Sequence, residues 1–334
     1  MSGPPAGARA GVDANGAGPD GEPAQDRPLL AWTSDHFAVP LPEGHPFPMA
    51  KYTLLREALL GEGVLAAGNV ARSEPAPLEW LHAAHEPAYV ARMLAGGLDA
   101  SEVRRLGLPW SPALVLRARA AVYGTVMAAR AALAHGVAGN LAGGTHHAFR
   151  DRGEAYCLFN DHAIAIALLR REGHARRPFV VDLDVHQGNG TAAIFASDPE
   201  VFTYSLHARH NYPLRKESST LDVELEDGDG DEPLLAALER TLPAALDRHG
   251  PDIAFYQAGV DALHADRLGR LRATHAGLAE RDRRVFAWLE ARGVPVVLTV
   301  GGGYGRPIET TVDAHANVWR AARAARERRA AVRS

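Results

Sequence analysis

Three acidic or imidazole side chains at alternate positions, Asp182, Asp184 and His186, follow an apolar run of this 334-residue chain. In an extended segment, residues at i, i+2 and i+4 point to one side. Two carboxylates that face the same way repel each other unless a cation or hydrogen-bond donors lie between them. Carboxylate and imidazole ligands suit Zn²⁺ or Fe²⁺ better than Ca²⁺ or Mg²⁺. We therefore interpret Asp184, His186 and the distant Asp261 as ligands of a catalytic metal with one position open to water or substrate.

The same residues allow a simpler interpretation, in which the two carboxylates cap a strand end and His186 packs in the core. A lone Asp-x-Asp-x-His does not decide between the two. The metal interpretation gains support from Asp261 and from the adjacent pair His146 and His147. Imidazoles titrate near neutrality and can carry protons beside a metal and its water.

Each imidazole of the pair needs an acceptor to fix its tautomer, and Asp182 and Asn189 lie in a segment that could supply one. Tyr304 lies in a Gly-rich turn. It is either an ordinary loop residue or, beside a metal, a phenol on flexible backbone that donates to a developing oxyanion. A phosphate-binding P-loop is excluded, because no Lys follows Gly301–Gly303.

Short apolar runs rich in β-branched residues precede these side chains, and helices are expected between the runs. The runs are Val137–Leu141, Phe179–Val185, Val201–Leu206, Ile253–Tyr256 and Val294–Val300. Capping residues and glycine stops predict helices from Ser111 to Gly136, from Asp231 to Gly250 and from Thr274 to Gly293. This alternation predicts one α/β domain with a mostly parallel sheet buried on both faces. In such sheets ligands bind outside the carboxyl ends of the strands.

Composition excludes several classes of protein. The 36 Lys and Arg residues nearly balance 40 Asp and Glu residues, for a net charge of −4, so nothing indicates a nucleic-acid partner. The single cysteine, Cys157, excludes an internal disulfide and a cysteine-ligated metal centre. It also fits a reducing, cytoplasmic location. No apolar run approaches the ~20 residues that span a bilayer, so no membrane partner is expected.

The two ends of the chain differ in composition from the middle. Residues 1–28 are rich in Gly, Pro and Ala, and we expect a disordered leader there. Residues 29–334 are expected to form one domain. The basic, Ala-rich run at residues 320–328 is expected to be a solvated helix end.

An ordered set of motifs resembles the zinc-dependent histone deacetylase family, most closely its class IV and bacterial class IV-like branch. The motifs are Gly-Gly-Thr-His-His-Ala (143–148), Cys-Leu-Phe-Asn-Asp (157–161), Asp-Leu-Asp-Val-His-Gln-Gly-Asn-Gly-Thr (182–191), Ser-Leu-His (205–207), Ala-Gly-Val-Asp (258–261), Asp-Arg-Leu-Gly (266–269) and Gly-Gly-Gly-Tyr (301–304). The resemblance covers about Trp32 to Ala316. It implies that residues 29–334 form one catalytic domain with the arginase–deacetylase fold, an eight-stranded parallel sheet between helices.

The resemblance also implies residue roles. The catalytic metal, zinc or alternatively Fe²⁺, would be held by Asp184, His186 and Asp261. The acid–base and oxyanion groups would be His146 backed by Asp182, His147 backed by Asn189, and Tyr304. A substrate tunnel would involve Tyr156, Cys157, Tyr212 and Gly302. A structural K⁺ or Na⁺ would be held, mainly through backbone oxygens, by Asp182, Asp184, His186, Ser205 and Leu206.

Two positions depart from the usual pattern. Asn189 stands where class I enzymes have Asp, which removes a charge that would raise the pKa of His147, although the class IV-like branch also has Asn. Val260 stands where Ala is usual, and we expect little effect from this buried wall residue.

The expected function is hydrolysis of acyl groups, acetyl or longer, from an acylated lysine of a peptide or protein or from a small acylated amine. One alternative is an acetylpolyamine-type deacetylase, for which Glu43 or Glu217 could meet a second ammonium group. Others are a long-chain fatty-acyl lysine deacylase and a non-catalytic binding protein on the same fold. An arginase-like activity is disfavoured, because the additional Asp and His ligands of a second metal are not found.

Overall fold

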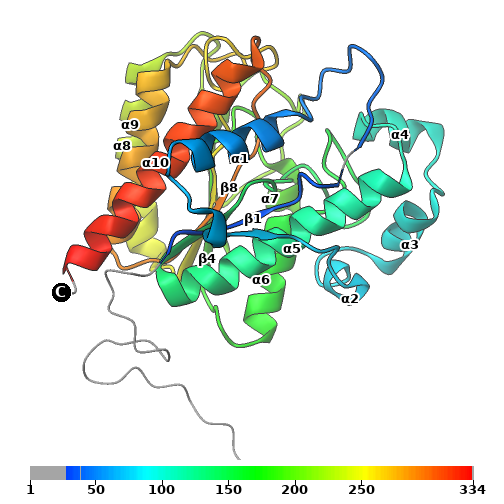
Figure 1. The fold of residues 1–334 in the computed structure, drawn as a ribbon, viewed down its shortest axis with the longest axis horizontal. Coiled ribbons are helices and arrows are strands. Elements are labelled where there is room, and N and C mark those ends of the chain that lie inside the picture. Colours follow the sequence, from blue (N-terminus) through cyan, green and yellow to red (C-terminus); the bar gives the residue numbers. More distant parts are fainter. Residues whose placement is uncertain (1–27, 38, 333–334) are drawn as a thin grey trace, which may run out of the picture.

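A computed structural model describes residues 28–37 and 39–332, so the predicted leader lies almost wholly outside the described residues. Eight parallel strands form one sheet in the order β2-β1-β3-β8-β7-β4-β5-β6 (Figure 1). They are β1 (Leu30–Thr33), β2 (Val70–Arg72), β3 (Val137–Asn140), β4 (Pro178–Asp182), β5 (Phe202–Ala208), β6 (Leu221–Leu225), β7 (Ile253–Gln257) and β8 (Val296–Thr299). The eight-stranded parallel sheet predicted from the sequence is confirmed.

Helices cover both faces of the sheet. They are α1 (Lys51–Gly61), α2 (Leu78–Leu81), α3 (Pro87–Ala95), α4 (Ala100–Leu106), α5 (Pro112–His135), α6 (Asp161–Arg171), α7 (Asn189–Phe195), α8 (Asp231–His249), α9 (His275–Ala291) and α10 (Ile308–Val332). One apolar cluster joins α1, α8, α9 and α10 to one face, and a second joins α3, α5, α6 and α7 to the other.

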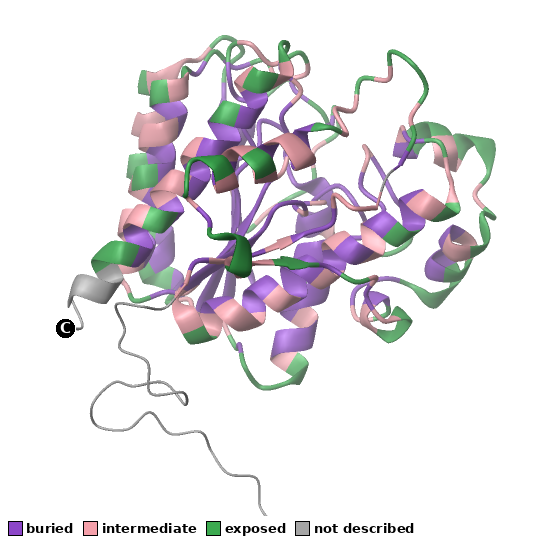
Figure 2. Ribbon diagram, viewed as in Figure 1, coloured by how far each residue is buried: buried purple, intermediate pink, exposed green. Residues whose placement is uncertain are grey.

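Side chains of each central strand alternate between the two clusters. Phe179 and Val181 of β4 belong to the cluster with α8 to α10, whereas Val180 belongs to the other. This is the period of two expected for a strand buried on both faces. Figure 2 shows the result, with the central strands buried and most exposed residues on the outer sides of the helices and in the loops.

The predicted helix signals act largely as expected. The Ser111 hydroxyl accepts a hydrogen bond from the backbone N–H of Leu114 at 3.1 Å at the start of α5, and Gly136 ends that helix with a φ of 86°. Asp231 does not cap α8, whose N-cap is Gly230. Its carboxylate instead accepts two hydrogen bonds of 2.7 Å from Thr274 at the start of α9.

The strand predicted at residues 179–185 ends three residues early, at Asp182, and the chain bends from Asp184 to His186. Side-chain carboxylates take the N–H groups that a neighbouring strand would otherwise bind. Asp182 Oδ1 accepts from the N–H of Asp184 at 3.2 Å, and Asp261 Oδ1 accepts from that of Val185 at 2.9 Å. The extended segment predicted as far as His186 is therefore not observed, although the side chains of Asp184 and His186 still come together.

The basic run at residues 320–328 lies in α10, but it is not solvated throughout. Ala322, Ala325 and Arg326 are buried, and α10 packs along α9. Small alanine side chains let the two helices approach, so this part of α10 belongs to the core as well as to the surface.

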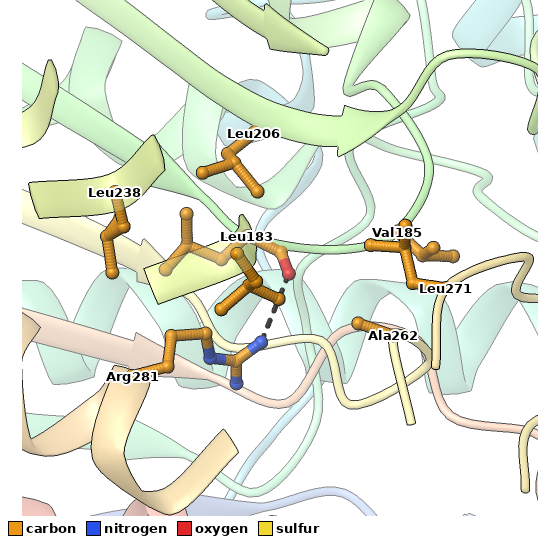
Figure 3. A pocket seen from close by; sticks show the side chains of 8 residues that line it. Leu183, Val185, Leu206, Leu238, Ala262, Leu271 and Arg281 are labelled. Atoms are coloured by element: carbon orange, nitrogen blue, oxygen red, sulfur yellow. Dashed lines mark hydrogen bonds between the residues drawn. The ribbon is translucent and has the colours of Figure 1, made fainter. Parts of the chain in front are cut away.

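Arg281 of α9 joins two loops at the carboxyl edge of the sheet. Its guanidinium donates hydrogen bonds to the carbonyls of Leu183, 3.2 Å away, and Gly259, 2.8 Å away. Figure 3 shows it reaching the Leu183 carbonyl beside a pocket lined mainly by leucines. Arg281 is 1% exposed and pairs at 2.8 Å with the fully buried Asp282. Removal of either partner would leave an uncompensated charge in the core.

We predict that Arg281→Met lowers the free energy of unfolding by about 3–5 kcal/mol, because Asp282 loses its counter-charge. Urea unfolding followed by circular dichroism measures the change. Arg284→Met is the matched control, since Arg284 lies on the same helix with its ion pairs partly in solvent and should cost at most about 1 kcal/mol. Equal losses for the two variants would contradict the prediction.

Candidate active site

Side chains from four loops meet at the carboxyl edge of the sheet. The strands β3, β8, β7 and β4 are consecutive neighbours, so the loops that follow them lie side by side. These loops carry His146 and His147, Tyr304, Asp261, and Asp184 with His186.

Asp184, His186 and Asp261 form a buried group whose potential ligand atoms all lie within 4.8 Å of one another. The Nδ1 atom of His186 is 3.0 Å from Asp184 Oδ1 and 3.1 Å from Asp261 Oδ2. Burial and the charge of Asp184 raise the pKa of Asp261 to about 7. A divalent cation would relieve this repulsion, and two carboxylates with one imidazole suit Zn²⁺ or Fe²⁺.

Gly302 forms one wall of this group. Its backbone N–H donates to Asp184 Oδ2 at 2.7 Å. A Cβ atom at Gly302 would lie 1.9 Å from Asp261 Oδ2 and 2.6 Å from Asp184 Oδ2. The close approach of the backbone to both carboxylates therefore requires glycine.

The two imidazoles after β3 are buried side by side, with ring centroids 4.0 Å apart. The Nδ1 atom of His146 is 2.7 Å from Asp182 Oδ2, and that of His147 is 2.7 Å from Asn189 Oδ1. Burial lowers the pKa of His146, but the charges of Asp182 and Asp184 outweigh it and raise the pKa to about 9. Burial and the neighbouring imidazoles hold the pKa of His147 well below its usual value.

Tyr304 lies in a turn that is held firmly, which differs from the flexible backbone expected from its glycines. Its N–H donates to Asp266 Oδ2 at 2.6 Å. The buried Lys51 donates to the carbonyl of Gly301 at 2.9 Å and to that of Gly303 at 3.4 Å. Burial and the charges of Asp184 and Asp261 raise the pKa of the Tyr304 phenol, so the hydroxyl stays protonated as a donor.

Aromatic rings surround the approach to these groups. The Tyr156 ring lies 6.0 Å from that of Tyr304, and the Tyr212 ring lies 5.1 Å from that of His147. Phe47, which the sequence patterns did not single out, lies 5.2 Å from Tyr156 and 6.4 Å from Tyr304. Its position between His45 and Pro48 in a Pro-rich segment was the available signal. The rings form a set of aromatic walls beside the group formed by Asp184, His186 and Asp261.

Cys157 lies next to this site, as expected from its place after Tyr156. Its thiol is buried and accepts a hydrogen bond from the backbone of His147. Burial raises the pKa of this thiol, which therefore stays neutral. A neutral, buried thiol is a packing group and not a nucleophile.

Asp266 and Lys51 also had no predicted role. Asp266 belongs to the Asp-Arg-Leu-Gly motif, and its second oxygen, Oδ1, accepts from the N–H groups of Leu268 and Gly269. Residue type alone could not show that both side chains bind the Tyr304 turn, because Lys51 lies 250 residues away from Gly301 in the chain.

The sheet with its flanking helices and the buried group at its carboxyl edge define an arginase–deacetylase fold. The sequence model of the protein family described as "Histone deacetylase domain" matches residues 45–321. The chain therefore belongs to the histone deacetylase family. Among the described residues, none of the helices has both the length and the apolar composition needed to cross a membrane.

Similar proteins come from distant sources. An uncharacterized protein of Picosynechococcus is 45% identical over 86% of this chain and 96% of its own length. Histone deacetylase 2 of Arabidopsis thaliana is 27% identical over 78% of this chain and 70% of its own. The crystal structure of an HDAC homolog from Aquifex aeolicus has a TM-score of 0.76 at 24% identity, covering 88% of this chain and 83% of that one.

We predict that Gly302→Ala weakens the binding of Zn²⁺ about 10-fold to 100-fold or more, because the added methyl group displaces the two carboxylates. Competition with a chromophoric chelator measures the dissociation constant. Gly61→Ala is the control, since a Cβ atom there meets nothing within 4 Å. A folded Gly302→Ala protein that binds zinc as tightly as the control would contradict the assignment.

Proposed function

We propose that the protein is a metal-dependent hydrolase that removes acyl groups from acylated lysine in peptides or proteins, or from a related small acylated amine. The observation that carries the proposal is the convergence of a buried Asp–His–Asp group with two imidazoles and a protonated phenol beneath aromatic walls. Asn189 behind His147 supports the class IV-like branch of the family.

Asp184, His186 and Asp261 would hold the metal, with Zn²⁺ the first choice and Fe²⁺ the second. A divalent ion at these ligands supplies Lewis acidity, which polarises a carbonyl group and lowers the pKa of water. Their burial and mutual distances support this role.

The side chains of the protein would bind and orient the substrate, and they would transfer protons. The Tyr304 hydroxyl would donate to the carbonyl oxygen of the substrate as negative charge develops there. His147, with its Nδ1 atom against Asn189, would accept the proton of the attacking water at Nε2. The His pair would deliver a proton to the leaving amine, and the contact of His146 with Asp182 supports it as the donor.

A structural K⁺ or Na⁺ would be held near the same loops by Asp182, Asp184, His186, Ser205 and Leu206. Support comes from the pairing of β4 with β5, in which Asp182 and Ser205 are partners. Both Ser205 and Leu206 are buried. A monovalent cation there would stabilise the bend after β4 by binding its carbonyl oxygens.

The aromatic walls support a substrate with an aliphatic stem, such as an acyl-lysine. Beside Tyr156 and the Gly143–Thr145 segment lies a cavity of about 60 Å³ that also borders Arg117. Its lining includes Tyr156 but none of Asp184, His186 and Asp261, so the preferred length of the acyl chain is a question for the substrate panel.

An acetylpolyamine-type substrate is the second candidate. Two hydrogen bonds join the backbone of Glu217 to the side chain of Gln187, which follows His186. This contact brings Glu217 into the neighbourhood of the site, where its exposed carboxylate could attract a second ammonium group.

We predict that Tyr304→Phe lowers kcat/KM on an acetyl-lysine peptide by on the order of 10²–10³, because the oxyanion loses its donor. Zinc content should stay unchanged. Tyr123→Phe is the control, since Tyr123 stacks on Trp80 in the other apolar cluster and should keep full activity. Wild-type turnover by the Tyr304→Phe protein would rule out the proposed role.

A panel of substrates tests the substrate class. We predict turnover of at least one acyl-lysine peptide in preference to acetylspermidine, because the aromatic walls suit the aliphatic stem of lysine. The comparison uses acetyl-, butyryl-, octanoyl- and myristoyl-lysine peptides and acetylspermidine, with the native metal identified. A myristoyl peptide or acetylspermidine as the best substrate would favour one of the alternatives. A metal-replete protein without turnover of any of them would favour a binding role.

A further inference from the structure

Glu154 is a carboxylate at the site that the proposed mechanism does not use. It is 8% exposed. Its Oε1 atom accepts a hydrogen bond from Asn189 Nδ2 at 3.0 Å and another from the Tyr212 hydroxyl. One oxygen of Glu154 therefore contacts both Asn189, which is the partner of His147, and Tyr212, which is one of the aromatic walls.

The contact decides which way the Asn189 amide faces. Glu154 Oε1 accepts the hydrogen bond and Asn189 Nδ2 donates it, so the NH₂ group of Asn189 is on the side toward Glu154. The reverse orientation would set two oxygens about 3 Å apart and leave the buried NH₂ group without this acceptor, which is unfavourable. The Asn189 oxygen is thereby directed to His147 Nδ1, 2.7 Å away.

An amide oxygen also only accepts, so the Nδ1 atom of His147 must carry the hydrogen. The lone pair of the neutral ring then lies on Nε2. We propose that Glu154 is a positioning residue that, through Asn189, holds His147 in the Nδ1–H tautomer. The consequence for catalysis rests on the proposed function, in which Nε2 of His147 accepts a proton.

The chain holds Glu154 in place by a tight turn. The N–H of Glu154 donates to the carbonyl of Cys157 at 3.0 Å, and the N–H of Cys157 donates back at 2.8 Å. The two residues between them, Ala155 and Tyr156, have φ of 44° and 69°. Their N–H groups donate to the carbonyls of Arg105 and Leu106 at the end of α4.

The turn has an energetic consequence. Left-handed backbone is unfavourable for a residue other than glycine and persists only where its surroundings impose it. Here the turn places the Tyr156 ring beside those of Phe47 and Tyr304 and leaves Glu154 facing Asn189. Arg152, 3.3 Å from Glu154 Oε2, supplies a partly exposed counter-charge.

The test determines the tautomer directly. Nitrogen-15 NMR of histidine in the full-length, zinc-loaded protein distinguishes Nδ1–H from Nε2–H, and a His147→Gln spectrum identifies the signals of His147. We expect the Nδ1–H form in the wild-type protein and in Glu154→Gln, whose amide oxygen can still accept from Asn189. Glu154→Ala should populate the Nε2–H form.

Kinetics of the same proteins give the second readout. In Glu154→Ala, kcat on an acetyl-lysine peptide should fall about 10-fold to 100-fold, part of the 10²–10⁴ that acid–base catalysis contributes. Its KM should change little, and Glu154→Gln should stay within about threefold of the wild type. Tyr212→Phe is the control: it removes the other donor to Glu154 and should leave the tautomer of His147 unchanged.

A wild-type protein with the Nε2–H form at His147 would overturn the proposal, whatever the variants do. An unchanged tautomer in folded Glu154→Ala would also overturn it. Failure of the proposed function looks different: the tautomer would still depend on Glu154, while no acylated amine would be turned over.

Discussion

The close approach of two buried carboxylates, Asp184 and Asp261, is the constraint on which the rest of the site depends. Two such charges do not stay together in a protein interior unless something between or around them compensates. Here His186 lies between them, and the backbone N–H groups of Val185 and Gly302 each donate to one of them. Arg281 adds a buried positive charge and binds the carbonyls of both loops. These contacts hold the two carboxylates close together, in a buried group that could hold a metal ion.

The location of the site could be predicted from the sequence because it depends on strand order and on the residues that come directly after each strand. Parallel strands bring their carboxyl ends to one edge, so glycines, aspartates and histidines after β3, β4, β7 and β8 had to meet. The end of β4 could not be predicted, because apolar Leu183 and Val185 continue the strand pattern. The strand ends because carboxylates compete for backbone N–H groups, and this competition depends on Asp261, 76 residues from Val185.

The supporting residues were missed for a related reason. Lys51 and Glu154 belong to no pattern that residue spacing reveals, and each acts through a contact far along the chain. Lys51, at the start of α1, donates to the carbonyl of Gly301, which is 250 residues further along the chain. Glu154 accepts a hydrogen bond from Asn189, which is 35 residues away. A sequence motif contains functional residues that lie in one segment of the chain. The residues that position them lie in other segments, which come close only in the folded protein.

The two imidazoles have different hydrogen-bond partners, and this difference gives them different roles in proton transfer. His146 faces the carboxylate of Asp182 directly, so a positive charge on this ring is stabilised by a full negative charge. His147 faces an amide, and the nearest carboxylate in that direction, Glu154, lies beyond the amide. The amide transmits orientation without bringing the charge into contact with the ring. One ring is therefore suited to carry a proton and its neighbour to stay neutral and accept one. His147 therefore keeps an oriented hydrogen bond although residue 189 is Asn and not Asp. Glu154 fixes the direction of this bond, and its carboxylate lies beyond the amide of Asn189, out of contact with the ring.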